Sequence, residues 1–216
     1  MKKHILPSSI MLLVIALDQW LKFWVKGSMD YMFNSRQLPQ DIPMTGDWFH
    51  LHFVENNGMA FGLEMGGETG KLFLTIFRIL AVGFGFWYLN RQLKNQAHTG
   101  FVVCVALIIA GAVGNIIDSV FYGLWFADVN SYQAGLFQGQ VVDMLYCPVV
   151  ETHYPSWFPF WGGEDFTFFS PVFNLADASI SVGVVTLVLF QNLFFRKPKE
   201  EELEGPDIAA ESPTEP

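Results

Sequence analysis

The sequence predicts an all-α membrane protein with a small β addition, in which four transmembrane helices carry short external elements. Apolar residues make up 51% of the 216 residues and aromatic residues 16%, a composition too apolar for an ordinary soluble domain. Long apolar stretches alternate with polar or mixed segments. Lysine and arginine gather in the segments at one end of these stretches.

Four spans are expected in order along the chain, and no internal repeat relates them. The first covers 8–27. No small-residue cleavage site follows its apolar run, so we expect a retained span instead of a removed signal peptide. The other three are expected at 71–88, 101–120 and 171–195, with a short polar loop over 90–98.

The distribution of cations predicts the orientation. The segment 121–170 contains no lysine or arginine. The cations at the other end of the spans are Lys2, Lys3, Arg91, Lys94, Arg196, Lys197 and Lys199. The positive-inside rule therefore places both termini in the cytoplasm, and the two long segments 28–70 and 121–170 outside.

The external segments predict short strands. Residues 48–54 alternate in part, with Trp48, His50, His52 and Val54 on one side of the chain and Phe49, Leu51 and Phe53 on the other, and 139–144 is a second strand-like piece. His50 and His52 could bind a metal, but no third ligand follows at a suitable spacing. Cys104 and Cys147 have neither disulfide nor metal spacing, so we expect two ordinary small apolar residues.

The acidic net charge of −9 arises mostly from the C-terminal segment. Residues 200–216 contain seven acidic side chains and no lysine or arginine. We therefore expect a membrane domain over 1–199 and a disordered acidic tail over 200–216, with no acidic binding surface on the domain itself.

Polar side chains recur in pairs near one end of the predicted spans. The pairs are Asp18 with Lys22, Asn115 with Asp118, and Asn174 with Asp177. Spacings of three or four residues place each pair on one helix face. Asn56 and Asp143 lie in the external segments at the same level. Because such groups are costly in lipid, we expect one shared site at the outer end of the bundle. Lys22 alone could instead snorkel to the interface, but the shorter Asp18 could not.

Two carboxylates in one site, Asp143 and Asp177, can share a proton. One can then take a proton from water while the other polarises a peptide carbonyl, as in aspartic proteases. Asp177 lies in the first turn of a helix, where the dipole favours the anion, so Asp143 is the expected proton carrier. A coupled pair leaves the reverse assignment open. Ser179 and Ser181 lack a suitable base, and no His-Glu-x-x-His pattern occurs.

These residues resemble the lipoprotein signal peptidase (signal peptidase II) family over roughly residues 8–195. Five motifs, weak singly but specific in this order, carry the resemblance: Asp18-x-x-x-Lys22, Asn56-x-Gly58-x-Ala60-Phe61-Gly62, Gly111-x-x-Gly114-Asn115-x-x-Asp118, Gly139-x-Val141-Val142-Asp143 and Phe173-Asn174-x-Ala176-Asp177.

The resemblance implies a membrane aspartic endopeptidase. Asp143 and Asp177 would be catalytic. The residues that would support the site or contact substrate are Asp18, Lys22, Asn56, Gly58, Asn115, Asp118 and Asn174. The implied substrate is a bacterial prolipoprotein, cut on the amino side of its diacylglyceryl-cysteine. Strands at 48–54 and 139–144 would form an external β-cradle, and 62–70 a short interfacial helix.

The resemblance also implies the surroundings of the enzyme. It would be a multi-pass protein of the bacterial cytoplasmic (inner) membrane, with its active site at the outer face. Membrane lipid would be a partner, and peptide inhibitors such as globomycin would bind at the aspartates. No cofactor, metal or nucleic acid is expected.

The sequence departs from the family pattern in two ways. Members commonly carry arginine directly after the third-helix aspartate, where this chain has Ser119. Either that cation is missing or Arg78 replaces it from another helix. The external segments on both sides of Asp143 are also long, and their aromatic residues would serve either as interfacial anchors or to shape substrate and lipid access.

Two other classes were weighed against a peptidase. An ion- or proton-coupled transporter also needs intramembrane carboxylates, but its sites lie at the midplane, commonly between inverted repeats. A non-catalytic membrane scaffold would have no use for paired aspartates beside two amides.

Overall fold

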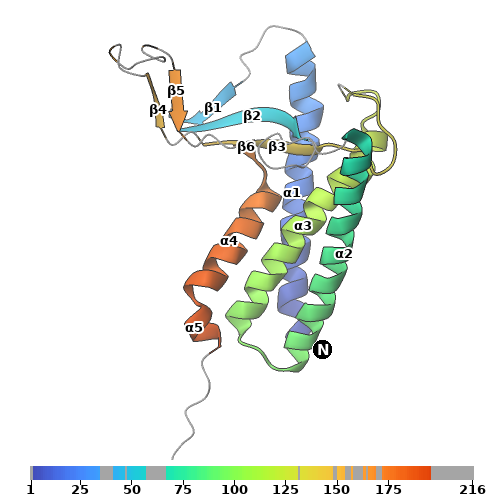
Figure 1. Cartoon of the computed structure of the whole chain (residues 1–216), viewed down its shortest axis with the longest axis vertical. Coiled ribbons are helices and arrows are strands. Elements are labelled where there is room, and N and C mark those ends of the chain that lie inside the picture. The colour runs from blue at the N-terminus through green and yellow to red at the C-terminus, as the bar shows by residue number, and fades with distance from the viewer. Residues whose placement is uncertain are drawn as a thin grey trace, which may run out of the picture.

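A computed structural model describes residues 2–34, 41–46, 48–56, 67–130, 132–147, 150–153, 157, 163, 165–168 and 172–195. Its helices form a bundle with strands gathered at one end (Figure 1). The helices are α1 (Lys2–Asn34), α2 (Gly67–Lys94), α3 (Thr99–Trp125), α4 (Leu175–Leu189) and α5 (Gln191–Phe194). The strands are β1 (Asp41–Thr45), β2 (Phe49–Asn56), β3 (Val141–Tyr146), β4 (Val150–His153), β5 (Asp165–Phe168) and β6 (Val172–Phe173).

Three helices of the described residues are long and apolar enough to cross a membrane. They cover His4–Ser28, Thr69–Lys94 and Thr99–Trp125, which correspond to the first three predicted spans. The fourth predicted span divides into α4, an apolar helix of 15 residues, and the short α5. The chain is therefore a mostly helical membrane protein with a small antiparallel sheet.

Two sequence-based boundaries at α2 are wrong. The predicted loop 90–98 is shorter, because α2 continues to Lys94 and only 95–98 connect it to α3. Arg91 and Lys94 in the last turn favour this extension, since cations stabilise a helix C-terminus. The predicted interfacial segment also differs: Gly67–Gly70 belong to α2, while 62–66 lie outside the described residues.

The central helix is α3, which packs against α1, α2 and α4. Small residues of α3 allow the close approach of α4. A Cβ atom on Gly111 would lie 2.2 Å from the carbonyl oxygen of Ala176. A Cβ atom on Gly114 would lie 2.7 Å from Oδ2 of Asp18. The N-terminal turn of α4 and the face of α1 that carries Asp18 therefore contact α3 at the same level, around Gly111 and Gly114.

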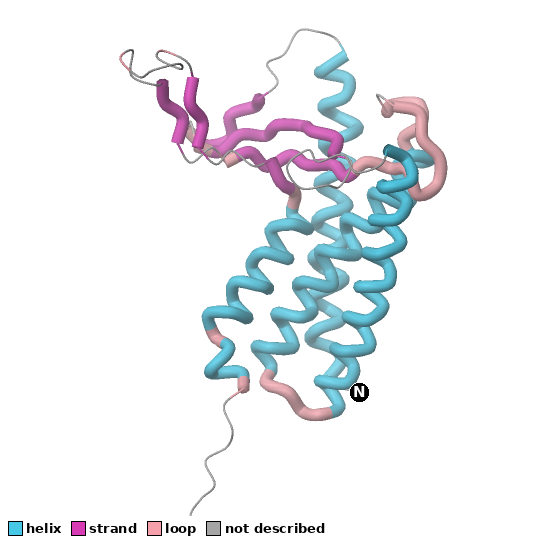
Figure 2. The backbone as a smooth tube through the Cα atoms, viewed as in Figure 1, coloured by secondary structure: helices cyan, strands magenta, loops and turns pink. Residues whose placement is uncertain are grey.

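A four-stranded antiparallel sheet, in the order β1-β2-β3-β6, lies across the end of the bundle away from the N-terminus (Figure 2). Its strands β2 and β3 correspond to the predicted strands at 48–54 and 139–144. The pairing places Val54 opposite Asp143 and Asn56 opposite Val141. Asn56 and Asp143 are therefore diagonal neighbours on one face of the sheet.

No pattern in the sequence predicted the second sheet, in which β4 pairs with β5. Each strand has only four residues, too few for an alternating pattern to be recognised. This pair occupies part of the long segment between Asp143 and α4. The N-terminus, the connection 95–98 and α5 lie at the opposite end of the bundle (Figure 1).

Candidate active site

Strand β3 carries Asp143 into the space between the sheet and the helices. The side chain is buried, with 4% of its surface exposed. Its Oδ1 accepts a hydrogen bond from Nδ2 of Asn174 at 2.7 Å, and its Oδ2 accepts one from Nδ2 of Asn56 at 3.2 Å. Two amides from different elements thus fix the orientation of this carboxyl group.

Asp177 is held at the start of α4. Asn174 is the N-cap of this helix and not a residue within it, so the predicted shared helix face is replaced by a capping box. Asn174 accepts a hydrogen bond from the backbone N–H of Asp177 at 2.8 Å. The side chain of Asp177 is held separately: its Oδ1 atom accepts a hydrogen bond from Nδ2 of Asn115 at 2.7 Å. Asn174 therefore contacts both aspartates.

Lys22 lies at the centre of the polar network and is fully buried. Its ammonium group contacts Asp18 at 2.9 Å, Asp118 at 2.7 Å and the Oδ1 atom of Asn115 at 3.0 Å. These three partners match the three donors of an ammonium group. Lys22 therefore does not snorkel; it joins two buried carboxylates to the amide that contacts Asp177.

Asp18 and Asp118 also hold the backbone of the site. Oδ1 of Asp18 accepts a hydrogen bond from the N–H of Ala176 at 2.9 Å. Oδ2 of Asp118 accepts one from the N–H of Val142 at 3.3 Å. These bonds attach the start of α4 and the middle of β3 to the helices α1 and α3. The two carboxylates therefore position the elements that carry Asp177 and Asp143.

The predicted polar residues within the described structure therefore form one connected network: Asp18, Lys22, Asn56, Asn115, Asp118, Asp143, Asn174 and Asp177. Gly58 lies outside the described residues.

Sequence reasoning missed further members of this network. Nε2 of Gln19 donates to Asp118 at 2.9 Å, and the hydroxyl of the buried Tyr122 donates to Oε1 of Gln19 at 3.0 Å. Lys26, one turn beyond Lys22, forms a buried ion pair with Glu55 and so attaches β2 to α1. Spacing of four residues, from Asp118 to Tyr122 and from Lys22 to Lys26, is the signal that could have found two of them.

The environment of Asp143 favours its protonated form. Burial, followed by the nearby charge of Asp177, raises the pKa of Asp143 to about 7. The hydrogen bond from Asn56, the charge of Lys22 and the hydrogen bond from Asn174 act in the opposite direction. The pair can therefore hold one proton near neutral pH.

This raised pKa predicts a pH-dependent stability. The folded protein binds the Asp143 proton more tightly than the unfolded chain does, so protonated Asp143 stabilises the fold. This contribution to the free energy of unfolding is fully present below the pKa of Asp143 in the unfolded chain, about 4. It is lost as the pH rises through the folded pKa of about 7, which lowers the free energy of unfolding by about 2–4 kcal/mol. In Asp143→Asn this loss should be absent, so the variant should be more stable than the wild type at pH 8. Denaturant unfolding in detergent across this pH range measures the difference; parallel curves would contradict the raised pKa.

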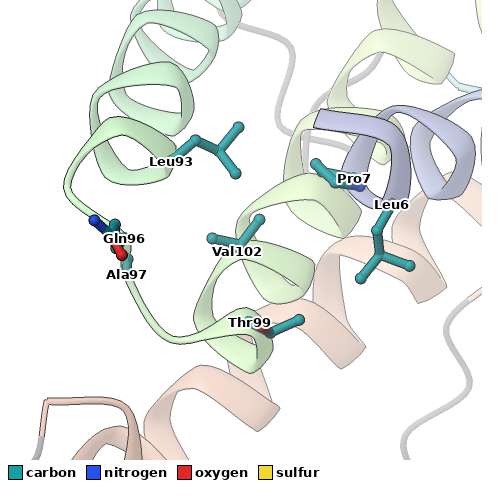
Figure 3. A pocket seen from close by; sticks show the side chains of 7 residues that line it. All are labelled: Leu6, Pro7, Leu93, Gln96, Ala97, Thr99 and Val102. Atoms are coloured by element: carbon teal, nitrogen blue, oxygen red, sulfur yellow. The ribbon is translucent and has the colours of Figure 1, made fainter. Parts of the chain in front are cut away.

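A separate pocket of about 400 Å³ lies away from this network, between the start of α1 and the connection from α2 to α3 (Figure 3). It is lined by Leu6, Pro7, Leu93, Gln96, Ala97, Thr99 and Val102. None of these side chains is an acid, a base or a nucleophile suited to peptide hydrolysis. The aspartate network remains the candidate active site.

Buried carboxylates gather at one end of the membrane-helix bundle, and comparison with known proteins identifies the class of protein that carries this site. Residues 10–194 match the family described as Signal peptidase (SPase) II. The chain belongs to this family and is a membrane peptidase.

Curated relatives agree with this assignment, and a solved structure shares the fold. A lipoprotein signal peptidase from Porphyromonas gingivalis is 45% identical over 193 residues, which cover 84% of this chain and 80% of the relative. One from Amoebophilus asiaticus is 37% identical over 195 residues, covering 89% and 80%. A solved bacterial membrane enzyme shares the fold with a TM-score of 0.55 and 22% identity, covering 90% of this chain and 93% of that chain. The transporter alternative receives no support.

Proposed function

We propose that this peptidase is an aspartic endopeptidase that removes the signal peptide from bacterial prolipoproteins, cutting on the amino side of the diacylglyceryl-cysteine. The observation that carries the proposal is the joint fixation of Asp143 and Asp177 by one amide. Asn174 donates to the first carboxyl group and caps the helix turn that holds the second. A buried carboxyl group, Asp143, and a half-buried one, Asp177, so placed form the acid–base pair that hydrolysis of a peptide bond by water requires.

The surroundings of the two carboxyl groups favour different catalytic roles for them, one as the base and the other as the acid. Asp177, in the first turn of α4 and bonded to Asn115, acts as the anion and takes a proton from the attacking water. Asp143 acts as the acid and donates its proton to the carbonyl oxygen of the scissile bond. The tetrahedral intermediate then breaks down as the proton taken by Asp177 passes to the amine of the cysteine. As the C–N bond breaks, one hydroxyl group of the intermediate returns its proton to Asp143 and becomes the carbonyl of the new carboxyl group, which restores the shared proton of the pair.

The arrangement also supports a position for the site in the membrane. We propose four spans, with α4 and α5 together forming the last, and both termini in the cytoplasm of a bacterium. The cations Arg91 and Lys94 lie at the bundle end away from the sheet, as the positive-inside rule requires for this orientation. The aspartates then lie at the outer face of the inner membrane, level with a lipidated cysteine anchored in the outer leaflet.

The remaining assignments follow from the same arrangement. The sheet β1-β2-β3-β6 would act as a cradle for the substrate peptide, and membrane lipid would surround the helices. Globomycin-type peptides would bind at the aspartates and compete with substrate. The acidic segment 200–216, expected from the sequence to be a separate tail, lies outside the described residues; the peptidase domain, 1–199, would not need it for cleavage.

Purified protein in lipid or detergent, incubated with a diacylglyceryl-cysteine prolipoprotein, tests the proposed function. We expect a released signal peptide whose mass ends at the residue before the cysteine. The same prolipoprotein without the diacylglyceryl group serves as the matched control and should remain uncut. Absence of cleavage, or equal cleavage of both substrates, would contradict the proposal.

A further inference from the structure

Arg78 is the one charged residue in the sequence of α2 between Lys71 and Arg91. An arginine at this depth is costly when it faces lipid. Its neighbours Ile76, Phe77 and Leu80 are largely exposed on the outside of the bundle, whereas the Arg78 side chain is partly buried. The exposed apolar side chains thus lie on a different face of α2 from Arg78.

The spacing along α2 shows which face Arg78 shares. Thr75 and Leu89 are buried, Val82 packs against the core cluster between α2 and α3, and Gly85 approaches α3 closely. These positions are separated by steps of three and four residues from Arg78 and from one another, which defines one helix face. Arg78 therefore lies on the face of α2 that contacts α3.

The register between the two helices gives the depth of Arg78. A Cβ atom on Gly85 would lie 3.1 Å from Cγ1 of Ile109, and the short connection 95–98 makes α2 and α3 antiparallel. Arg78 precedes Gly85 by seven residues, so it lies level with the residue seven positions after Ile109, which is Ile116. The neighbour of Ile116 is Asn115, which donates to Asp177. Consistent with this placement, Arg78 interacts electrostatically with Asp177 and Asp143.

The charges of the site leave a role for this cation. Lys22 contacts both Asp18 and Asp118, so this buried group already carries one excess negative charge. Ionisation of one member of the aspartate pair adds another. Among the other charged groups described at this end of the bundle, Lys26 and Glu55 form an ion pair with each other, and Lys71 donates to the backbone carbonyl of Gln138 at 2.7 Å. Ser119 is uncharged, and its hydroxyl donates within its own helix to the carbonyl oxygen of Asn115 at 2.9 Å.

We propose that Arg78 is a positioning residue for the aspartate pair, holding one of the two carboxyl groups ionised while the other keeps its proton. This inference rests on the proposed aspartic mechanism. Ser119 stands where the family commonly has arginine, so the sequence left open whether that cation is missing or is replaced by Arg78. Under this proposal Arg78 of α2 supplies the cation.

A cation beside a carboxyl pair lowers the pH at which the first proton is lost. Without Arg78 the pair should keep both protons to a higher pH, and the acid side of the pH–rate profile should move upward. A purely structural loss would instead lower activity equally at every pH. The pH profile therefore separates the two roles.

The test compares kcat/KM for prolipoprotein cleavage from about pH 4 to about pH 9 in the wild type, Arg78→Gln and Arg78→Lys. We expect Arg78→Gln to move the acid limb upward by about one pH unit, with about tenfold lower kcat/KM on that limb. Arg78→Lys keeps the charge and should follow the wild-type limb. Arg91→Gln, in the same helix at the far end of the bundle, is the matched control and should leave the profile unchanged.

The outcomes distinguish this inference from the proposed function. An unmoved acid limb in Arg78→Gln, or equal limbs in Arg78→Gln and Arg78→Lys that both differ from the wild type, would overturn the role of Arg78. If Arg78→Gln does not fold, Arg78→Met, which retains the aliphatic stem, replaces it and should move the acid limb upward in the same way. In that case an acid limb of Arg78→Lys that differs from the wild-type limb would by itself overturn the role of Arg78. Cleavage by Asp143→Asn would instead overturn the aspartic mechanism itself.

Discussion

Asp143→Asn and Asp177→Asn are each expected to reduce prolipoprotein cleavage by about 10³-fold or more. Asparagine has nearly the same shape as aspartate, and its carbonyl oxygen can still accept the hydrogen bond from Asn174 or Asn115. It cannot exchange a proton with water or with the scissile peptide. The loss should therefore appear in kcat, while the affinity for substrate changes much less.

Exposed Asp128, in the turn after α3, provides a matched control. Asp128→Asn changes the same chemical group without contacting the network and should retain wild-type kcat. Thermal unfolding of each purified variant shows whether the fold is intact. Cleavage within tenfold of the wild-type rate by either active-site variant would exclude the proposed acid–base pair.

Lys22→Met is expected to destabilise the protein by about 3–5 kcal/mol, because removal of one partner leaves uncompensated buried charge. Asp18 and Asp118 are almost fully buried and would lose their shared cation. Both carboxylates also accept bonds from the backbone of α4 and β3, so their rearrangement should displace Asp177 and Asp143 as well. Stability and cleavage should fall together.

Unfolding in detergent by denaturant measures this change. Lys94→Met, at an exposed position near the end of α2, is the control and should change the free energy of unfolding by less than about 0.5 kcal/mol. Adding Asp18→Asn and Asp118→Asn to Lys22→Met should recover part of the stability, since no unpaired charge then remains. A Lys22→Met variant as stable as Lys94→Met would contradict the network described for Lys22.

Much of the site could be predicted from the sequence because membrane burial makes each polar residue informative. The pairs Asp18 with Lys22 and Asn115 with Asp118 identified the helix faces that meet, and the structure joins them through Lys22. The catalytic roles themselves remain proposals. The strands at 48–54 and 139–144 were also recognisable, the first from its partial alternation and the second as a short strand-like piece.

Other features depend on contacts between distant segments, which no local pattern encodes. The ion pair of Lys26 with Glu55 joins α1 to β2, and the bond of Gln19 to Asp118 joins α1 to α3. The depth of Arg78 likewise follows only from the register of α2 against α3. The capping role of Asn174 was missed because its spacing of three from Asp177 fits both a helix face and a capping box.

Titration of the Asp143 carboxyl group tests most directly the claim that Asp143 and Asp177 act as one coupled pair. Carboxyl-labelled aspartate in the wild-type protein, assigned by comparison with Asp143→Asn, gives this value by nuclear magnetic resonance. We predict that Asp143 titrates near pH 7 in the wild type, and at lower pH in Asp177→Asn because the neighbouring negative charge is gone. Titration near the ordinary carboxyl value of about 4 in both proteins would contradict the account.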